Sequence, residues 1–478
     1  MPTEKEWLTF AKWGEIYGIT IFQLSSETSL TVSFAGDICS VTVLGQPIVI
    51  LNSAKSAIEM LDKKSAIYSD RPQLVMAGEL CGWKNTLVLL PYADRFRRFR
   101  RLFHNLIGNA ALVKRFYPAE EIEVRKYLRR LLAKPDDPAT QVQKHAGSVI
   151  LRVSHGYEVK ETYDQFVDLA DRATDQFSLA TAPGAFLVDL VPALRHLPSW
   201  LPGTGFLKTA QDWSGTLFEM VERPHNFVKQ QMAAGTAEVS FTSTLLERNQ
   251  PTPDEELDIK WAAASLYSGG ADTSTAALRA LFLTLAKHPE VQKKAQEEID
   301  AVVGGDRLPS YEDRERLPYI NALIIELLRW HTVVPLAAPH RLMQDDVHEG
   351  YFIPKGTLII PNVWKCSHDP RVYNEPFRFN PDRFLSSKDR APEPDPRDFC
   401  FGFGRRICPG LHLADATLFI TAVMTLAVFD ISKCVENGVI IEPVHDYTTG
   451  TISHPTPFKC SVKPRSEQAV ALIQSECN

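Results

Sequence analysis

One cysteine, Cys408, lies in a segment whose residue types suit a metal-bound thiolate. The segment runs from Phe401 to Gly410 and reads Phe-Gly-Phe-Gly-Arg-Arg-Ile-Cys-Pro-Gly. Its glycines let the backbone bend close to a flat ligand, and backbone N–H groups near the sulfur can stabilise its negative charge. Arg406 can pair with an anionic group of that ligand. These features predict that Cys408 is the axial ligand of a haem iron and that Arg406 binds a haem propionate.

Three other interpretations of this cysteine were weighed. A buried structural cysteine is common, because a free cysteine packs as a small hydrophobe, but the spacing Phe-x-x-Gly-x-Arg-x-Cys-x-Gly is more specific than that. A zinc site would need close-spaced ligands, and no Cys-x-x-Cys pair accompanies Cys400 and Cys408. A disulfide is disfavoured because the 8 cysteines are scattered over 478 residues, which suits a reducing compartment. The cysteines expected to have no ligand are Cys39, Cys81, Cys366, Cys400, Cys434, Cys460 and Cys477.

A second group of residues that could do chemistry lies inside a long predicted helix, at about 253–288. It contains the run Gly-Gly-Ala-Asp-Thr-Ser. Glycine inside a helix costs about 1 kcal/mol relative to alanine, so Gly269 and Gly270 predict close approach of a ligand or a local kink. An acid beside a threonine, here Asp272 and Thr273, can relay protons from solvent to dioxygen. Taken alone, the Asp-Thr pair would also suit a cap at a helix break.

These segments resemble those of the cytochrome P450 family, the haem-thiolate monooxygenases. The cysteine segment is similar to the family's haem-binding signature, and the run at 269–274 is similar to its oxygen-activation motif, Ala/Gly-Gly-x-Asp/Glu-Thr-Thr/Ser. Glu326 and Arg329 match the family's Glu-x-x-Arg, and Arg383 is the downstream partner. The resemblance covers nearly the whole chain, because the motifs occur in the family's order. It implies that this triad is buried and structural rather than catalytic.

The resemblance also implies further contacts to the haem. The family places propionate-binding arginines where this chain has Arg100 and Arg341. Near the first, the family pattern is Trp-x-x-x-Arg, whereas this chain has Phe96, which lacks an indole N–H donor. Asp272 and Thr273 are the expected catalytic residues, and Cys408 is the expected metal ligand. The expected cofactor-binding residues are Arg100, Arg341, Phe401, Arg406, Cys408, Gly410, Gly269 and Gly270.

The predicted fold is mainly α-helical with a small β region, as the resemblance implies for a single P450 catalytic domain over residues 1–478. Apolar periodicity indicates helices, and β-branched runs indicate strands. The chain is expected to be mainly helical from 53 to 250, with a long central helix over the haem. The other expected elements are helices at 1–18, 289–303, 318–330 and 409–429, a β-hairpin at 41–51, strands near 347–361 and 437–463, and an irregular stretch at 385–400.

Residues 19–36 depart from the family, which runs directly from the first helix into the first strand. Removing them would join Gly18 to Asp37 in a normal-looking junction, and the stretch is short enough to be a retained intron. We therefore expect a retained intron, which sequencing of the mature transcript would test. The alternative is a genuine strand-rich surface loop, since surface loops tolerate insertions.

The sequence also bears on location. No run of about 20 apolar residues, the length that spans a bilayer, and no secretory segment is apparent. Eukaryotic relatives usually begin with a membrane anchor and a proline-rich hinge, and this chain begins where such a hinge would end. Either the protein is soluble or an N-terminal membrane anchor has been lost from this sequence, and we expect the second. The native protein would then lie on the cytosolic face of the endoplasmic reticulum membrane. Residues 183–206, rich in Pro, Leu, Phe and Trp, would suit a substrate entrance that touches the bilayer surface, and ordinary core packing is the alternative for each of them.

The composition limits the kinds of molecule that this protein is expected to bind. A hydrophobic content of 44% is enough for a sizeable core, and a net charge of −6 implies no general affinity for nucleic acid. The arginines between 95 and 101 are expected to form mainly a solvated helix face. No flavin or nicotinamide module is apparent. The resemblance therefore implies haem b (heme b, iron protoporphyrin IX) as cofactor and NADPH used indirectly, through NADPH–cytochrome P450 reductase docked on a basic patch.

The function implied is insertion of one oxygen atom of O2 into a lipophilic small molecule, by hydroxylation or epoxidation. Short sequence segments that resemble those of fungal members indicate a role in secondary metabolism. The protein is expected to be a monomer. Two alternatives stay open. One is a haem-thiolate isomerase or dehydratase, although such enzymes often lose the pair that is intact here as Asp272 and Thr273. The other is a non-catalytic haem-binding relative.

Overall fold

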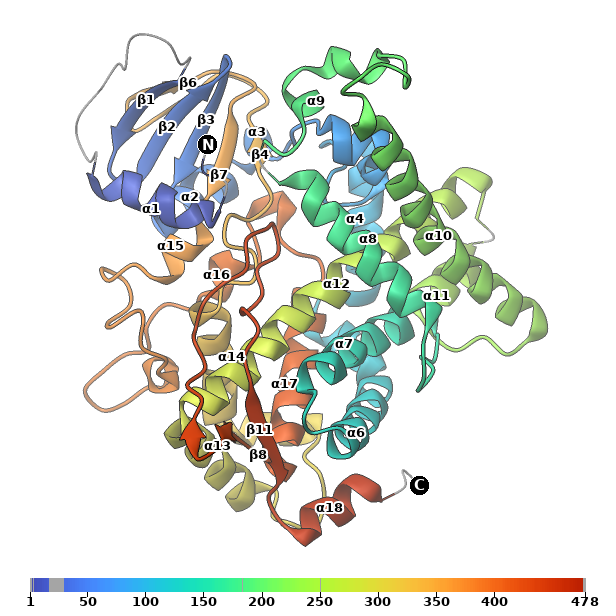
Figure 1. The fold of residues 1–478 in the computed structure, drawn as a ribbon, viewed down its shortest axis with the longest axis vertical. Coiled ribbons are helices and arrows are strands. Elements are labelled where there is room, and N and C mark those ends of the chain that lie inside the picture. The colour runs from blue at the N-terminus through green and yellow to red at the C-terminus, as the bar shows by residue number, and fades with distance from the viewer. Residues whose placement is uncertain (1, 3, 17–29, 183, 250, 476–478) are drawn as a thin grey trace.

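The long helix α12 (Pro253–Lys287) crosses the middle of the molecule, with a sheet at one corner and most other helices on the opposite side (Figure 1). The structure is a computed structural model that describes residues 2, 4–16, 30–182, 184–249 and 251–475. The other helices are α1 (Glu6–Ile16), α2 (Ala54–Ala57), α3 (Ser65–Tyr68), α4 (Asp94–Ile107), α5 (Ala110–Val113), α6 (Tyr117–Ala133), α7 (Pro138–His155), α8 (Gln165–Thr181), α9 (Leu187–Leu190), α10 (Gly205–Ala234), α11 (Phe241–Asn249), α13 (Pro289–Val302), α14 (Pro318–Trp330), α15 (Val363–Ser367), α16 (Arg397–Cys400), α17 (Leu411–Val428) and α18 (Glu467–Gln474).

The main sheet has the strand order β1-β2-β3-β7-β4, in which only β3 and β7 pair in parallel. The hairpin expected at 41–51 is confirmed as β2 and β3. The strands are β1 (Leu30–Ala35), β2 (Ile38–Val43), β3 (Gln46–Leu51), β4 (His340–Arg341), β5 (Asp346–His348), β6 (Tyr351–Ile353), β7 (Leu358–Pro361), β8 (Phe429–Lys433), β9 (Val435–Glu436), β10 (Val439–Ile440) and β11 (Cys460–Pro464).

Part of the unusual segment 19–36 belongs to this sheet. Residues 30–35 form the edge strand β1, which pairs along its whole length with β2. Residues 19–29 lie outside the described residues. The pairing of β1 is what the surface-loop alternative requires, and the retained intron stays a prediction for the transcript.

The central helix α12 begins at a proline and a capping box, two sequence signals that mark the start of a helix. The Thr252 side chain accepts from the N–H of Glu255, whose carboxylate accepts from the N–H of Thr252, and Pro253 occupies the first helical position. Beyond this capping box the helix is apolar and largely buried, and it packs most extensively on α7. The signals at the sequence level therefore gave the bounds of α12 closely.

The arginines of α4 are not all a solvated face. Arg97 and Arg101 are exposed, as expected. Arg95 and Arg98, however, reach the buried Asp258 of α12, with Nε to carboxylate distances of 2.8 and 2.7 Å. These two arginines share one carboxylate and so fasten α4 to the central helix, a contact that the sequence pattern did not reveal.

Helix α17 follows the cysteine segment and is largely apolar after Asp415. Among the described residues it is the one helix that is long and apolar enough to cross a membrane, and 72% of its apolar window is buried inside the protein. It packs against α12, α13 and α14. Burial of this extent identifies α17 as a core helix.

Candidate haem-thiolate site

The cysteine segment forms a tight loop between α16 and α17. The N–H of Cys408 donates to the carbonyl oxygen of Phe401 at 2.7 Å, which closes the loop. Gly402 and Gly404 have φ of +85° and +49°, in the left-handed region. A Cβ on Gly404 would lie 2.6 Å from the carbonyl oxygen of Leu61. The loop therefore needs glycine at 404 both for its backbone angle and for its close packing.

The sulfur of Cys408 is accessible although much protein lies around it. Cys408 is exposed, so that a molecule of the size of water can reach it. Yet burial among protein atoms raises the pKa of its thiol, while the Gly410 N–H and the Arg100 guanidinium lower it. An accessible sulfur with these two polar neighbours fits a thiolate that is covered by a flat metal-bearing ligand.

The competing interpretations of Cys408 find no structural support. The cysteines of the described part of the chain, Cys408 included, are all free. In the same residues, the three-residue cluster of His and carboxylate groups that could hold a metal includes neither Cys400 nor Cys408. The loop thus offers a single sulfur ligand, which is the number that a haem iron takes from a cysteine loop.

Two of the three predicted propionate-binding arginines lie at the cysteine loop. Arg406 is part of the loop, and Arg100 reaches it from α4. Arg100 of α4 donates from Nη1 to the carbonyl oxygen of Ile407 at 2.6 Å. Arg406 is buried, and its guanidinium carbon lies 3.8 Å from the centre of the Phe96 ring. Phe96, at the position of the family's tryptophan, therefore supports an arginine with its ring face instead of donating an N–H.

The third predicted arginine, Arg341, lies on β4 at the edge of the main sheet. Its backbone N–H donates to the carbonyl oxygen of Asp70 at 2.9 Å, while its half-buried side chain has no hydrogen-bond partner within the described residues. A cation without a protein partner suits an external anion such as a propionate.

Sequence reasoning missed a fourth cation, Arg71. It is buried and donates to three backbone carbonyl oxygens, those of Val88, Ala338 and Pro339. Burial lowers the pKa of Arg71 to about 10, and burial together with the repulsion of Arg71 lowers the pKa of Arg406 to about 8. The Asp70 carboxylate partly offsets this repulsion, and the two haem propionates would add further negative charge beside the two guanidinium groups. The run Ser-Asp-Arg-Pro at 69–72 was the signal for Arg71.

The glycine pair of α12 separates into two roles. A Cβ on Gly269 would meet nothing within 4 Å, and Gly269 is exposed although the helix before it is buried. A Cβ on Gly270 would lie 2.6 Å from Cδ1 of Ile150 on α7. Gly269 thus leaves room for a ligand, whereas the geometry explains Gly270 by helix packing. Contact of Gly270 with the haem stays a prediction.

The two residues predicted to deliver protons, Asp272 and Thr273, lie on the same helix. Thr273 is one turn from Gly269 and donates from Oγ1 to its carbonyl oxygen at 2.7 Å, so its hydroxyl lies on the open face of α12. Asp272 points elsewhere and forms an ion pair with His454, with 3.0 Å between Oδ1 and Nε2. The sequence did not indicate His454, because nothing in its local pattern connects it to the helix.

The predicted triad is buried, as expected. Arg329 donates from Nε and Nη2 to both carboxylate oxygens of Glu326, at 2.7 and 2.8 Å. Arg383 donates from Nε to the same carboxylate at 3.1 Å and from Nη1 to Glu393 at 2.6 Å. The N–H of Asn380 also donates to Glu326. This network braces the irregular segment that leads to the cysteine loop, and its burial gives it no access to a substrate.

Phe401, predicted near the sulfur, is half-buried and packs with the core around α14 and α17. Its carbonyl oxygen is the group that meets Cys408.

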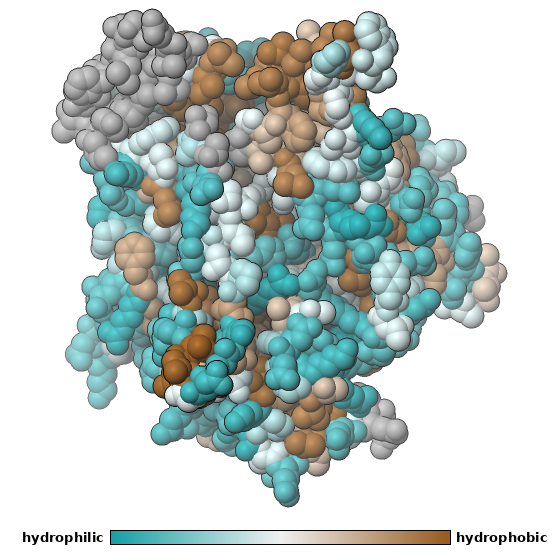
Figure 2. Space-filling model, viewed as in Figure 1, coloured by the Kyte–Doolittle hydropathy of each residue, from teal (hydrophilic) through white to brown (hydrophobic). Residues whose placement is uncertain are grey.

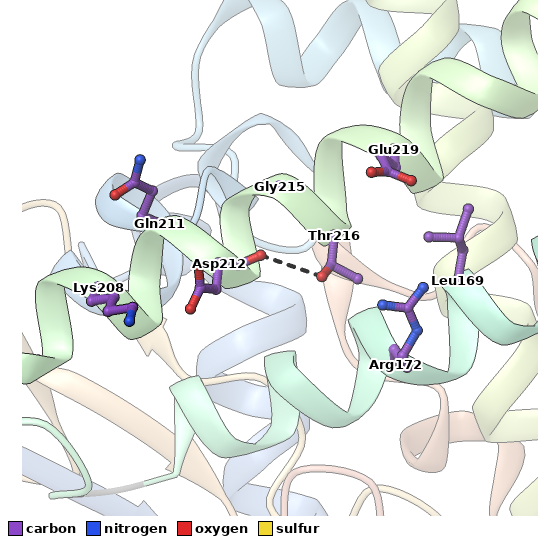
Figure 3. Close-up of a pocket in the computed structure, with 8 residues that line it drawn as sticks. All are labelled: Leu169, Arg172, Lys208, Gln211, Asp212, Gly215, Thr216 and Glu219. Carbon is purple, nitrogen blue, oxygen red and sulfur yellow. Dashed lines mark hydrogen bonds between the residues drawn. The ribbon is translucent and has the colours of Figure 1, made fainter.

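A separate depression of about 470 Å³ lies between α8 and α10 (Figure 3). Its lining is polar and of mixed charge, with Arg172 on α8 and Asp212 and Glu219 on α10. Thr216 donates to the carbonyl oxygen of Asp212 at 3.3 Å, a contact within the helix. None of the predicted site residues lines this depression, so it is distinct from the cysteine site.

A helical fold with a single-cysteine loop under a central helix, and with clustered arginines at the side, defines a haem-thiolate protein.

Comparisons with known proteins agree with this class of protein. The cytochrome P450 family profile matches residues 21–462. Cytochrome P450 monooxygenase 208 of Postia placenta is 54% identical over 473 residues, which are 99% of this chain and 89% of the relative. Cytochrome P450 monooxygenase claR of Ampulloclitocybe clavipes is 49% identical over 476 residues, covering 99% and 85%. Cytochrome P450 monooxygenase ppsD of Aspergillus oryzae is 40% identical over 479 residues, covering 99% and 87%.

The chain belongs to the cytochrome P450 family and is a cytochrome P450 monooxygenase. A haem-thiolate cofactor, O2 and an electron-transfer partner follow from this membership.

Proposed function

We propose that this P450 hydroxylates or epoxidises a lipophilic small molecule of fungal secondary metabolism, with Cys408 as the thiolate ligand. The observation that carries the ligand assignment is the accessible, unpaired sulfur of a loop closed by Phe401 and flanked by Arg100. The full-length similarity to fungal monooxygenases supports the reaction class and the metabolic setting.

Haem b would be held by residues from several elements. Arg71, Arg100, Arg341 and Arg406 would neutralise its two propionates, and Gly410 would donate its N–H to the Cys408 sulfur. The bound haem supplies binding and reductive activation of dioxygen, chemistry that no amino-acid side chain provides. The role of the chain is to position this group, to exclude water with the apolar core of α12 and α17, and to deliver protons.

Proton delivery is assigned to α12. The Thr273 hydroxyl lies on the open face beside Gly269, where it can hold a proton for the site, and Asp272 is the adjacent group that can take protons from solvent. The isomerase alternative does not need this pair. Its presence therefore favours the monooxygenase reading for this chain.

The substrate is proposed to be apolar because the segments expected around the haem are apolar. Residues 262–268 of α12 are mostly buried alanine, leucine and tyrosine, and residues 333–338 follow α14. The tail at 449–452 reaches α8, where the Thr181 and Thr451 hydroxyls lie 3.0 Å apart. Such a lining recognises shape more than polar groups.

An exposed apolar surface surrounds α9 and the segment after it. It comprises Leu187, Leu190, Val191, Leu197 and Trp200, of which Trp200 is 78% exposed. Apolar residues are also prominent at the top of the molecule, over α9, in Figure 2. We assign this surface to contact with a bilayer, which fits the cytosolic face of the endoplasmic reticulum membrane for a natively anchored protein.

Electrons are proposed to come from NADPH–cytochrome P450 reductase. Exposed cations occur near the cysteine loop, namely Arg405 within the loop and Arg97 and Arg101 on α4, which Arg100 links to the loop. They would meet an acidic surface of the reductase.

Turnover with isotopic oxygen tests the function. The haem-loaded enzyme, the reductase and NADPH would be incubated with apolar terpenoid, polyketide and indole compounds under 18O2. Incorporation of one 18O atom into a product, with NADPH consumed in step, is expected. A product that forms without NADPH and contains no 18O would instead support the isomerase or dehydratase alternative.

A further inference from the structure

The carboxylate of Asp272 belongs to a polar cluster that joins four parts of the fold. His454, in the loop before β11, forms the ion pair with Asp272. Asp171 and Asp175 of α8 lie one helical turn apart, so they share a face, and both interact electrostatically with Asp272. Gln143 of α7 donates from Nε2 to Oδ2 of Asp171 at 2.9 Å.

The charges of this cluster are uneven. Three carboxylates, those of Asp171, Asp175 and Asp272, repel one another electrostatically. Arg279 of α12 interacts with Asp171 and Asp272 and donates to Oε1 of Gln143 at 2.8 Å. His454 is the group in direct contact with Asp272, with 3.0 Å between Nε2 and Oδ1. Mutual repulsion of the carboxylates favours keeping a proton within the cluster.

His454 is held rigidly. Its backbone N–H donates to Oγ1 of Thr448 at 2.9 Å, and its carbonyl oxygen accepts from the Thr448 N–H at 2.9 Å. Its Nδ1 is buried and has no hydrogen-bond partner within the described residues, whereas Nε2 meets Asp272. A histidine that relays a proton needs a partner at each ring nitrogen. Because Nδ1 of His454 has none among the residues described, this ring cannot pass a proton on. It can hold Asp272 in place.

The carboxylates form a gradient from solvent to the helix. Asp175 is exposed, Asp171 is half-buried, and the Asp272 side chain is 23% exposed. Burial and the nearby Asp272 raise the pKa of Asp175. Burial, followed by Asp272 and Asp175, raises the pKa of Asp171 to about 6 against the bond from Gln143. Both groups of α8 therefore carry protons closer to neutral pH than an ordinary aspartate does.

We propose that His454 is a positioning residue that holds the Asp272 carboxylate, and that Asp171 and Asp175 pass protons to it from the solvent side of α8. The proposal rests on the proposed role of Asp272 and Thr273. The overall reaction takes two electrons from NADPH and two protons per O2; one oxygen atom enters the product and the other leaves as water. When protons arrive late, the same electrons and protons leave as hydrogen peroxide instead.

The test compares variants of the haem-loaded enzyme with the reductase and an accepted substrate. The measured quantity is hydrogen peroxide formed per NADPH consumed. His454→Phe removes the bond and is expected to raise this ratio roughly fivefold, with unchanged haem content and carbon-monoxide spectrum. His454→Gln keeps a donor without charge. It is expected to restore wild-type coupling, because the side-chain amide can still donate to the Asp272 carboxylate.

Asp171→Asn gives a readout that does not depend on turnover. The folded-state pKa of Asp171, about 6, lies above the ordinary aspartate value of 3.8, so the wild-type protein loses stability as the pH rises between these values. The variant is expected to melt higher than wild type at about pH 7.5 but not at about pH 4. Asp212→Asn, on the exposed face of α10, is the control and should change neither melting nor coupling.

The outcomes separate the two proposals. If Asp272→Asn and Thr273→Ala left coupling unchanged, the proposed proton path itself would be wrong. If those variants uncoupled turnover while His454→Phe behaved as wild type, the positioning role of His454 would be overturned. An Asp171→Asn variant with wild-type coupling and an unaltered melting profile would remove Asp171 from the path.

Discussion

Arg100 of α4 donates from Nη1 to the carbonyl oxygen of Ile407, 2.6 Å away, and so ties α4 to the residue before Cys408. Burial raises the pKa of the Cys408 thiol, and the same guanidinium opposes this rise. One arginine thus fixes the position of the cysteine loop and favours the charged form of its sulfur.

Replacing Arg100 should weaken haem retention. Arg100→Met removes a charge-assisted hydrogen bond, a contribution of about 1.5–3 kcal/mol, and we expect haem to leave roughly tenfold faster. The measurement is the rate of haem transfer to an excess of apomyoglobin. Arg101→Met, at an exposed neighbouring position, should transfer haem at the wild-type rate. Equal rates for both variants would show that Arg100 does not support the haem.

The buried triad should control folding rather than chemistry. Glu326→Gln leaves the buried Arg329 without a carboxylate partner and Arg383 with Glu393 alone, and an uncompensated buried charge typically costs about 3–5 kcal/mol. The midpoint of denaturant unfolding should fall accordingly. Glu375→Gln breaks an exposed pair with Arg378 and should cost less than about 1 kcal/mol. A Glu326→Gln protein of wild-type stability would contradict the bracing role.

Glycine at 404 should be required more strictly than glycine at other left-handed positions. Gly404→Ala adds a Cβ 2.6 Å from the Leu61 carbonyl oxygen, on top of the strain from φ of +49°. Gly235→Ala has a φ of +71° but meets no atom within 4 Å, so it isolates the backbone strain of about 1 kcal/mol. We expect Gly404→Ala to lose clearly more stability and to bind less haem. Equal losses would mean that the close packing of the loop is unimportant.

Glu120 should make stability fall with rising pH. Burial raises the pKa of this carboxyl group to about 8, although Tyr311 and Thr417 donate to it. Between the ordinary value of 4.5 and about 8, the folded protein holds a proton that the unfolded chain releases, so stability declines over this window.

Glu120→Gln removes this titration. The loss of unfolding free energy from about pH 5 to pH 8 should then shrink by an amount on the order of 3 kcal/mol, measured by urea unfolding at both values. Glu219→Gln, on α10, serves as the control. A pH dependence that survives in Glu120→Gln would assign it to another group.

The sequence was enough to predict the fold class, the bounds of α12 and α14, and the cysteine loop, because each depends on local signals. Pro253 and the Thr252–Glu255 capping box mark a helix start whatever lies around it. Contacts between distant segments could not be predicted in this way. The bond of Asp258 to Arg95 and Arg98 and the bond of Asp272 to His454 join residues far apart in the chain, so only the packed structure reveals them.

The ligand of the haem iron is the central assignment, and the carbon-monoxide spectrum of the reduced protein tests it most directly. Wild-type enzyme with intact Cys408 ligation should show the family's red-shifted Soret band. Cys408→Ala should lose this band even in preparations that retain haem, as measured by total haem content. Cys400→Ala, the neighbouring cysteine, should keep it. A Cys408→Ala protein that shows the unchanged red-shifted band would contradict the assignment of Cys408 as the thiolate ligand.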